Sequence, residues 1–63
     1  MKKYYSPKLI KRSKKENYKI WQCLAYSDIE GYTEYFQITD YNGNFIKNVV
    51  TFQLALKEVK NKI

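Results

Sequence analysis

Three runs rich in aromatic and aliphatic residues, separated by short polar segments, occupy the middle of this 63-residue chain. The runs span residues 18–26, 32–41 and 44–50. Aromatic and β-branched side chains favour strands. Asn42-Gly43, between the second and third runs, is typical of a tight hairpin, because both residues accept the positive φ of a type I′ turn. The pattern predicts three consecutive antiparallel strands.

Residues 51–63 change to a helical period. Their apolar residues recur at i, i+3, i+4, i+7 and i+11, which places them on one face of a helix: Phe52, Ala55, Leu56, Val59 and Ile63. Thr51 is a suitable N-cap, and the lysines near the C-terminal end favour the helix dipole. The chain is therefore predicted to be an α+β protein of order β-β-β-α, a three-stranded antiparallel sheet with the helix packed on one face.

The lengths of the two loops predict which side chains share a face of this sheet. A two-residue loop at 42–43 places Phe36 opposite Val49, and a four-residue loop at 28–31 places Lys19 opposite Asp40. One face then carries Trp21, Cys23, Ala25, Phe36, Ile38, Phe45 and Val49. The other face carries Tyr18, Ile20, Leu24, Tyr26, Tyr35, Tyr41, Ile46 and Val50. A slip of one residue in the first loop would exchange the faces of the first strand.

Both predicted faces are apolar, although only one helix is available to cover them. Contiguous exposed apolar area is uncommon on soluble monomers and tends to mark an interface. We therefore expect the second face to be covered either by the N-terminal segment or by another molecule.

Charge is distributed unevenly along the chain. Residues 1–19 contain eight lysines or arginines and one acidic residue, whereas residues 20–50 contain one lysine and four acidic residues. This contrast predicts a basic N-terminal arm at 1–16 joined to a β-β-β-α domain at 17–63. Ser6-Pro7 resembles a helix start, so the arm is expected to be a disordered tail, a short helix or a docked strand.

A basic arm favours a polyanionic partner, because segments rich in Lys and Arg bind phosphates. The leading hypothesis is a small accessory nucleic-acid-binding protein, with DNA favoured, whose tyrosines stack on bases. The predicted contacts are Lys8, Lys11, Arg12, Lys14, Lys15 and Lys19, with Tyr18 and Tyr35 as stacking residues. A solubilising tail and an amphipathic membrane anchor are the other interpretations of the arm. The anchor lacks the large apolar face that such helices need, so no membrane contact is expected.

The tyrosine content supports a rival hypothesis, a protein-binding module such as an inhibitor or adaptor. Tyrosine is enriched in interfaces because its ring gives contact area at low entropy cost. The predicted interface, which would also serve a homodimer, is Tyr26, Tyr35, Tyr41, Ile46 and Val50. In the plainest interpretation, the aromatic residues only fill a small core.

Few residues are suited to catalysis or to a cofactor. The chain has no histidine and one cysteine, so it lacks the base of a nucleophilic triad, the ligands of a zinc site and a disulfide of its own. Cys23, inside a predicted strand, is expected to be a small core residue. The acidic residues of 28–40 could hold Mg²⁺, and residues 58–60 match the end of a nuclease pattern, but solvated surface charge explains both. We expect no enzyme and no cofactor.

No apolar run reaches the roughly 18 residues of a membrane span. A lone cysteine is typical of reducing compartments. A cytoplasmic location is therefore expected.

The predicted order of elements across residues 18–63, with the Thr51-Phe52 transition into the helix, resembles two families of small DNA-binding domains. They are the N-terminal domains of some tyrosine recombinases and the plant AP2-type domain. The resemblance implies a sheet whose uncovered face enters the major groove and reads DNA with basic and aromatic side chains. This chain departs from that pattern, because its second and third strands offer only Lys47 beside two acidic residues. The departure favours the N-terminal arm as the DNA contact.

Overall fold

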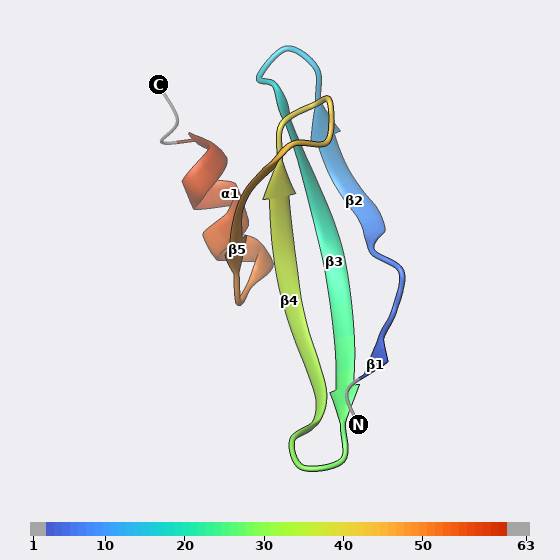
Figure 1. Ribbon diagram of the computed structural model, residues 1–63. Helices are drawn as coiled ribbons and strands as arrows, with labels where there is room; N and C mark the ends of the chain where they lie inside the picture. The colour runs from blue at the N-terminus through green and yellow to red at the C-terminus, as the bar shows by residue number, and fades with distance from the viewer. Residues whose placement is uncertain (1–2, 61–63) are drawn as a thin grey trace.

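In the computed structural model, which describes residues 3–60, an antiparallel sheet of five strands carries one C-terminal helix (Figure 1). The strands are β1 (Lys3–Tyr4), β2 (Lys8–Ser13), β3 (Tyr18–Ser27), β4 (Gly31–Thr39) and β5 (Phe45–Val49), and the helix is α1 (Phe52–Lys60). The α+β class is confirmed, and the predicted three-stranded sheet is an undercount.

The N-terminal segment supplies the two additional strands. β1 and β2 both pair with β3, antiparallel, along the edge that β4 leaves free. Residues 5–7 separate them, and Pro7 lacks the N–H that would continue the ladder there. The Tyr5 N–H still donates to the Leu24 carbonyl at 3.0 Å. Of the structures expected for this segment, the docked strand is the one observed, and the short helix is wrong.

The β3–β4 hairpin is one residue tighter than predicted. Gly31 has φ of 73° and pairs with Ser27, so only residues 28–30 form the loop. Lys19 consequently lies opposite Thr39, and the predicted pairing of Lys19 with Asp40 is wrong. Because directly opposite residues share a face, the shift exchanges the two faces of β3 relative to β4.

The two faces therefore differ in composition from the prediction. The face under the helix, here called the helix-side face, contains Tyr18, Ile20, Leu24 and Tyr26 of β3 with Phe36 and Ile38 of β4. The opposite face, here called the open face, contains Lys19, Trp21, Cys23 and Ala25 with Tyr35, Gln37 and Thr39. The predicted grouping of Trp21, Cys23 and Ala25 with Phe36 and Ile38 is wrong.

The β4–β5 hairpin is confirmed, but its turn is of another type. Gly43 has φ of 97° and donates its N–H to the Asp40 carbonyl at 3.0 Å, while the Asp40 N–H donates to the Asn44 carbonyl at 2.9 Å. Asn42 keeps a negative φ. This is a three-residue loop in which a type I turn is followed by a left-handed glycine, rather than a type I′ turn. The predicted pairing of Phe36 with Val49 is confirmed.

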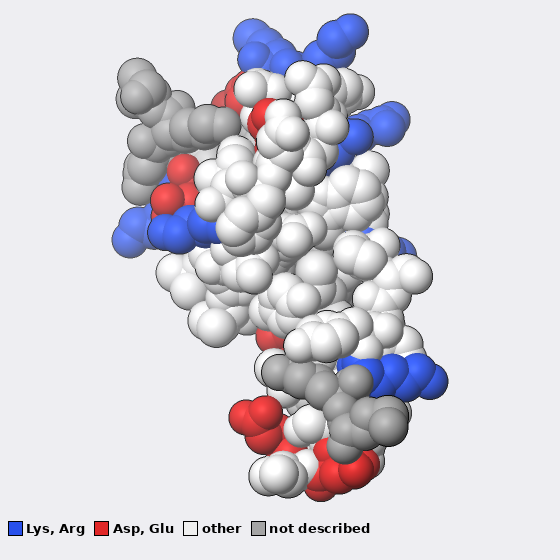
Figure 2. Space-filling model, viewed as in Figure 1, with Lys and Arg blue, Asp and Glu red and all other residues white. Residues whose placement is uncertain are grey.

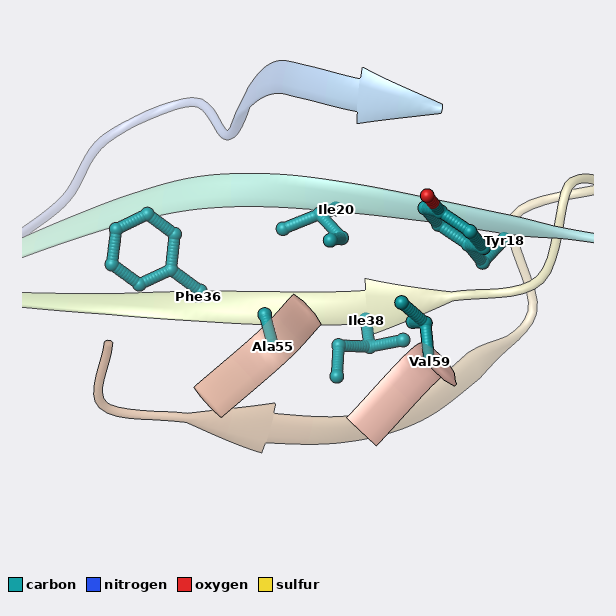
Figure 3. Close-up of a cluster of buried hydrophobic side chains, with 6 residues drawn as sticks. All are labelled: Tyr18, Ile20, Phe36, Ile38, Ala55 and Val59. Atoms are coloured by element: carbon teal, nitrogen blue, oxygen red, sulfur yellow. The ribbon is translucent and has the colours of Figure 1, made fainter. Parts of the chain in front are cut away.

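The core lies between the helix-side face and α1 (Figure 3). Ile20 and Ile38 lie opposite each other at the centre and are almost fully buried. Ala55 and Val59 of α1 face them from the helix, as the predicted stripe requires. Phe52 and Leu56 pack at the margin, and the Thr51 Oγ1 caps the helix by accepting the Leu54 N–H at 3.1 Å. The last member of the stripe, Ile63, lies outside the described residues.

The helix covers only part of its face. Nine residues of α-helix span about 14 Å, whereas the ten residues of β3 span about 33 Å. The molecule is accordingly elongated, with extents of 40 × 19 × 16 Å. Beyond the helix, rings cover the face: the centroid of Tyr32 lies 4.9 Å from that of Tyr26 and 6.4 Å from that of Tyr5.

Two isoleucine-to-alanine substitutions test this arrangement of the core. We expect Ile20→Ala to lower the free energy of unfolding by about 2–5 kcal/mol, because it opens a cavity at a fully buried site. A domain of this size has roughly 3–5 kcal/mol of stability, so this variant should be largely unfolded. Urea denaturation followed by circular dichroism measures the change.

The control is Ile29→Ala in the β3–β4 loop, where the native side chain is 95% exposed. It should alter the free energy of unfolding by about 0.5 kcal/mol at most. Equal losses in the two variants would contradict the placement of Ile20 in the core.

Candidate functional site

Two hairpin turns meet at one end of the sheet. Residues 14–17 form the turn from β2 to β3, in which Asn17 adopts the left-handed conformation at φ of 60°. The side-chain oxygen of Asn17 accepts the backbone N–H of Tyr41, in the β4–β5 turn, at 3.1 Å. This hydrogen bond holds the basic β2–β3 turn against the neighbouring hairpin (Figure 1).

Four of the six predicted basic residues gather at this end. Arg12 of β2 lies directly opposite Lys19 of β3, which places both on the open face. Lys14 and Lys15 are exposed in the turn between them. We call Arg12, Lys14, Lys15 and Lys19 the basic end.

The other two predicted basic residues, Lys8 and Lys11, lie farther along the edge strand β2. Lys8 lies opposite Gln22, and Lys11 lies opposite Ile20 across a bulge in β2. Both are exposed and belong to the helix-side face. The six cations therefore do not form one surface.

Within residues 3–60, none of the cations of the basic end is ion-paired to a carboxylate. Among residues 3–60, the one ion pair joins Lys47 to Glu58 at 3.4 Å. Like charges directly opposite each other, such as Arg12 and Lys19, destabilise a sheet. The Lys19 ammonium instead lies 5.0 Å from the ring centroid of Tyr41 and 5.9 Å from that of Trp21. These cation–π contacts hold it on the open face without neutralising its charge.

Acidic groups collect at the other end of the molecule. Figure 2 shows mostly Lys and Arg atoms, with some Asp and Glu atoms, around the end that carries the β2–β3 turn, and mostly Asp and Glu atoms, beside some Lys or Arg atoms, around the end that carries the β3–β4 loop. Asp28 and Glu30 belong to that loop. Acidic side chains thus predominate at the β3–β4 loop, whereas basic side chains predominate at the β2–β3 turn, which also contains Glu16.

Asp40 lies close to the basic end, but its carboxylate accepts hydrogen bonds from residues of the β4–β5 turn. Hydrogen bonds from the Asn44 side-chain amide and the Asn44 backbone N–H lower the pKa of the Asp40 carboxyl, and the backbone N–H groups of Asn42 and Gly43 add to this. The distances to the carboxylate oxygens are 2.9 Å from the Asn44 amide, 2.8 Å from the Asn44 N–H and 2.9 Å from the Asn42 N–H. The Asp40 carboxylate thus stabilises the β4–β5 turn, and within residues 3–60 it forms no ion pair with a lysine.

A shallow depression of about 170 Å³ lies on the open face beside the basic end. Its lining residues are Pro7, Trp21, Gln37, Thr39 and Gly43. Trp21 is half-buried, and its indole N–H donates to the Thr39 hydroxyl at 3.0 Å. That hydroxyl donates in turn to the Asp40 carbonyl at 3.0 Å. The indole is therefore held in a fixed orientation at the wall of the depression.

The two tyrosines predicted to stack on bases have different surroundings. Tyr18 is 4% exposed and belongs to the core, so its ring is not available to a partner. Tyr35 is half-buried on the open face, where its hydroxyl is hydrogen-bonded to the Cys23 thiol. Trp21 and Gln37 were not predicted as site residues, because the predicted register grouped Trp21 with Phe36 and Ile38 rather than with the tyrosines. Gly31, as the glycine that closes a three-residue loop, was the available signal for the correct register.

The residues predicted as a protein interface do not share one face. Tyr26 lies on the helix-side face and Tyr35 on the open face, while Tyr41 belongs to the β4–β5 turn. Ile46 and Val50 are 39% and 70% exposed, within and just after β5. The three-residue β3–β4 loop puts Tyr26 and Tyr35 on opposite faces of the sheet, whereas the predicted four-residue loop put them on one face.

Cys23 is buried, and burial raises the pKa of its thiol, although hydrogen bonds with Tyr35 and the Gln37 backbone act in the opposite direction. Across residues 3–60, no three His, Cys, Asp or Glu side chains come together as a metal site would require. The helix within this part of the chain is too short and too polar to cross a membrane.

No protein-family model matches the chain, and no curated protein or solved structure shows significant similarity to it. The resemblance to the recombinase and AP2-type domains therefore stays a prediction from the order of elements. The observed five-stranded sheet also departs from the three strands on which it was based.

The hydrogen bonds to Asp40 predict a pH dependence of stability. Because the folded-state pKa is lowered, the ionised carboxylate stabilises the fold above its ordinary pKa of about 4, and this contribution is lost as the pH falls through the folded value. We expect wild type to be more stable than Asp40→Asn at neutral pH and the two to converge by about pH 2. Urea midpoints of both proteins measured across this pH range test the prediction. A difference in midpoint between wild type and Asp40→Asn that stays constant with pH would contradict it.

The burial of Cys23 predicts a thiol that reacts slowly in the folded protein. Both limited access and the raised pKa disfavour the reactive thiolate. At neutral pH, modification by an aromatic disulfide reagent should be at least about tenfold slower than in concentrated urea. Comparable rates under the two conditions would show that β3 is open at this position.

Proposed function

We propose that this chain is a small accessory nucleic-acid-binding protein, with DNA favoured, that contacts phosphates through its basic end. The observation that carries the proposal is the gathering of four cations on the β2–β3 hairpin, none of them ion-paired to a carboxylate within residues 3–60, with Asn17 linking this hairpin to the β4–β5 turn. Clustered cations of this kind attract a polyanion, because each phosphate contact releases condensed counterions.

The arrangement of charge supports an end-on approach. The acidic β3–β4 loop lies at the opposite end of a molecule 40 Å long, far beyond the roughly 8 Å screening length at physiological salt. Its repulsion therefore opposes binding along the full sheet but not at the basic end. Arg12 and Lys19 project from strands rather than from a flexible tail, so less conformational entropy is lost when they bind.

A protein-binding module remains the second candidate, and exposed apolar side chains near β5 favour it. Phe45 is 60% exposed and Val50 70% exposed, and Ile46 and Leu54 are also exposed. An interface formed by these residues would tolerate salt, because it does not depend on counterion release.

Matched charge substitutions test the proposal. The double variant Arg12→Gln/Lys19→Gln should bind a labelled DNA duplex more weakly than wild type. Its slope of log affinity against log salt should be shallower by about 2, since each lost phosphate contact contributes roughly 0.9. Fluorescence anisotropy across about 50–200 mM salt gives both quantities.

The control is Lys57→Gln/Lys60→Gln, which removes the same net charge from exposed positions of α1. It should leave the salt slope close to that of wild type. Equal effects of the two double variants would mean that net charge rather than the basic end governs binding, and absent binding of wild type to both duplex and single-stranded DNA would refute the proposal. Point substitutions are preferred to removal of residues 1–16, since that truncation would delete two strands of the sheet.

A further inference from the structure

The depression beside the basic end combines the features of a site for one planar ring. Its wall includes the half-buried Trp21 indole, which the hydrogen bond to Thr39 holds in place. Its volume of about 170 Å³ is below the roughly 300–1,000 Å³ of ordinary small-molecule sites. Pro7 and Gly43 line the rest of it without long side chains that would fill it.

One lining residue has hydrogen-bonding groups to offer. The Thr39 hydroxyl already accepts from Trp21 and donates to the Asp40 carbonyl. Among residues 3–60, the Gln37 carboxamide has no side-chain hydrogen bond. A carboxamide both donates and accepts, which matches the edge of a nucleobase.

Two cations lie close enough to Trp21 to contact the phosphates of a nucleic acid whose base is bound there. Lys19 is on the same strand and face as Trp21, two residues away, and Arg12 lies opposite Lys19. A base held against the indole would therefore have its phosphates next to two positive charges. In single-strand binders, the same combination of an aromatic ring and a cationic groove binds bases and backbone together.

We propose that the depression binds one unpaired nucleobase, stacked against Trp21 and hydrogen-bonded to Gln37, so that the protein prefers single-stranded to duplex nucleic acid. The proposal rests on the function proposed above and specifies its substrate. A base in a duplex is stacked on both sides and paired along its edge, so it cannot enter a depression on a sheet surface.

Trp21 is the only tryptophan of the chain, so its fluorescence reports on this site directly. Wild type is titrated at one salt concentration with oligothymidylate, with oligouridylate and with a DNA duplex of the same length. We expect the single strands to quench the emission and to bind at least roughly tenfold tighter than the duplex, which corresponds to one stacked base. The two single-stranded probes distinguish a DNA from an RNA preference.

Gln37→Leu tests the hydrogen-bonding group, and Gln53→Leu on the exposed surface of α1 is its matched control. Gln37→Leu should weaken single-strand binding about five- to tenfold, with duplex binding unchanged. Gln53→Leu should change neither. Circular dichroism checks that both variants fold. If one of them does not, the comparison of single strands with duplex in the wild-type protein still tests the base site.

The possible failures are distinguishable. Salt-dependent binding of equal strength to single strand and duplex, without quenching, would overturn the base site and leave the phosphate-binding proposal standing. Absence of binding to every probe would overturn both.

Discussion

The register between β3 and β4 is the constraint on which the rest of the structure depends. It is set by a three-residue loop that Gly31 closes in the left-handed conformation at φ of 73°. This pairing places Ile20 opposite Ile38 and so creates an apolar centre for α1 to cover. A loop longer by one residue would direct Lys19 and Trp21 of β3 toward the helix instead.

The same register produces the candidate site. With Ile20 under the helix, Lys19 and Trp21 must lie on the open face, because neighbouring residues of a strand alternate sides. β2 then adds Arg12 opposite Lys19, and the β4–β5 turn adds Tyr41 beside it. Core and site are thus two consequences of one pairing.

The N-terminal segment has a structural role as well as a charge. As strands β1 and β2 it completes the sheet on the free edge of β3, and its lysines and the bulge between Leu9 and Lys11 protect that edge from pairing with another chain. Its cations thereby become part of a rigid surface. A flexible arm would bind the same polyanion at a greater entropic cost.

Local signals in the sequence predicted the strands from Tyr18 onward, the β4–β5 hairpin and the apolar stripe of α1, because β-propensity, turn chemistry and helical period act between near neighbours. Thr51 as the helix cap is another local feature of this kind. The register of β3, the docking of residues 3–13 and the depression at Trp21 were decided only by the tertiary structure. Both faces of β3 are apolar, so the pattern of the strand itself does not choose between them, and the pairing closed at Gly31 is the one that places Ile20 opposite Ile38 under α1.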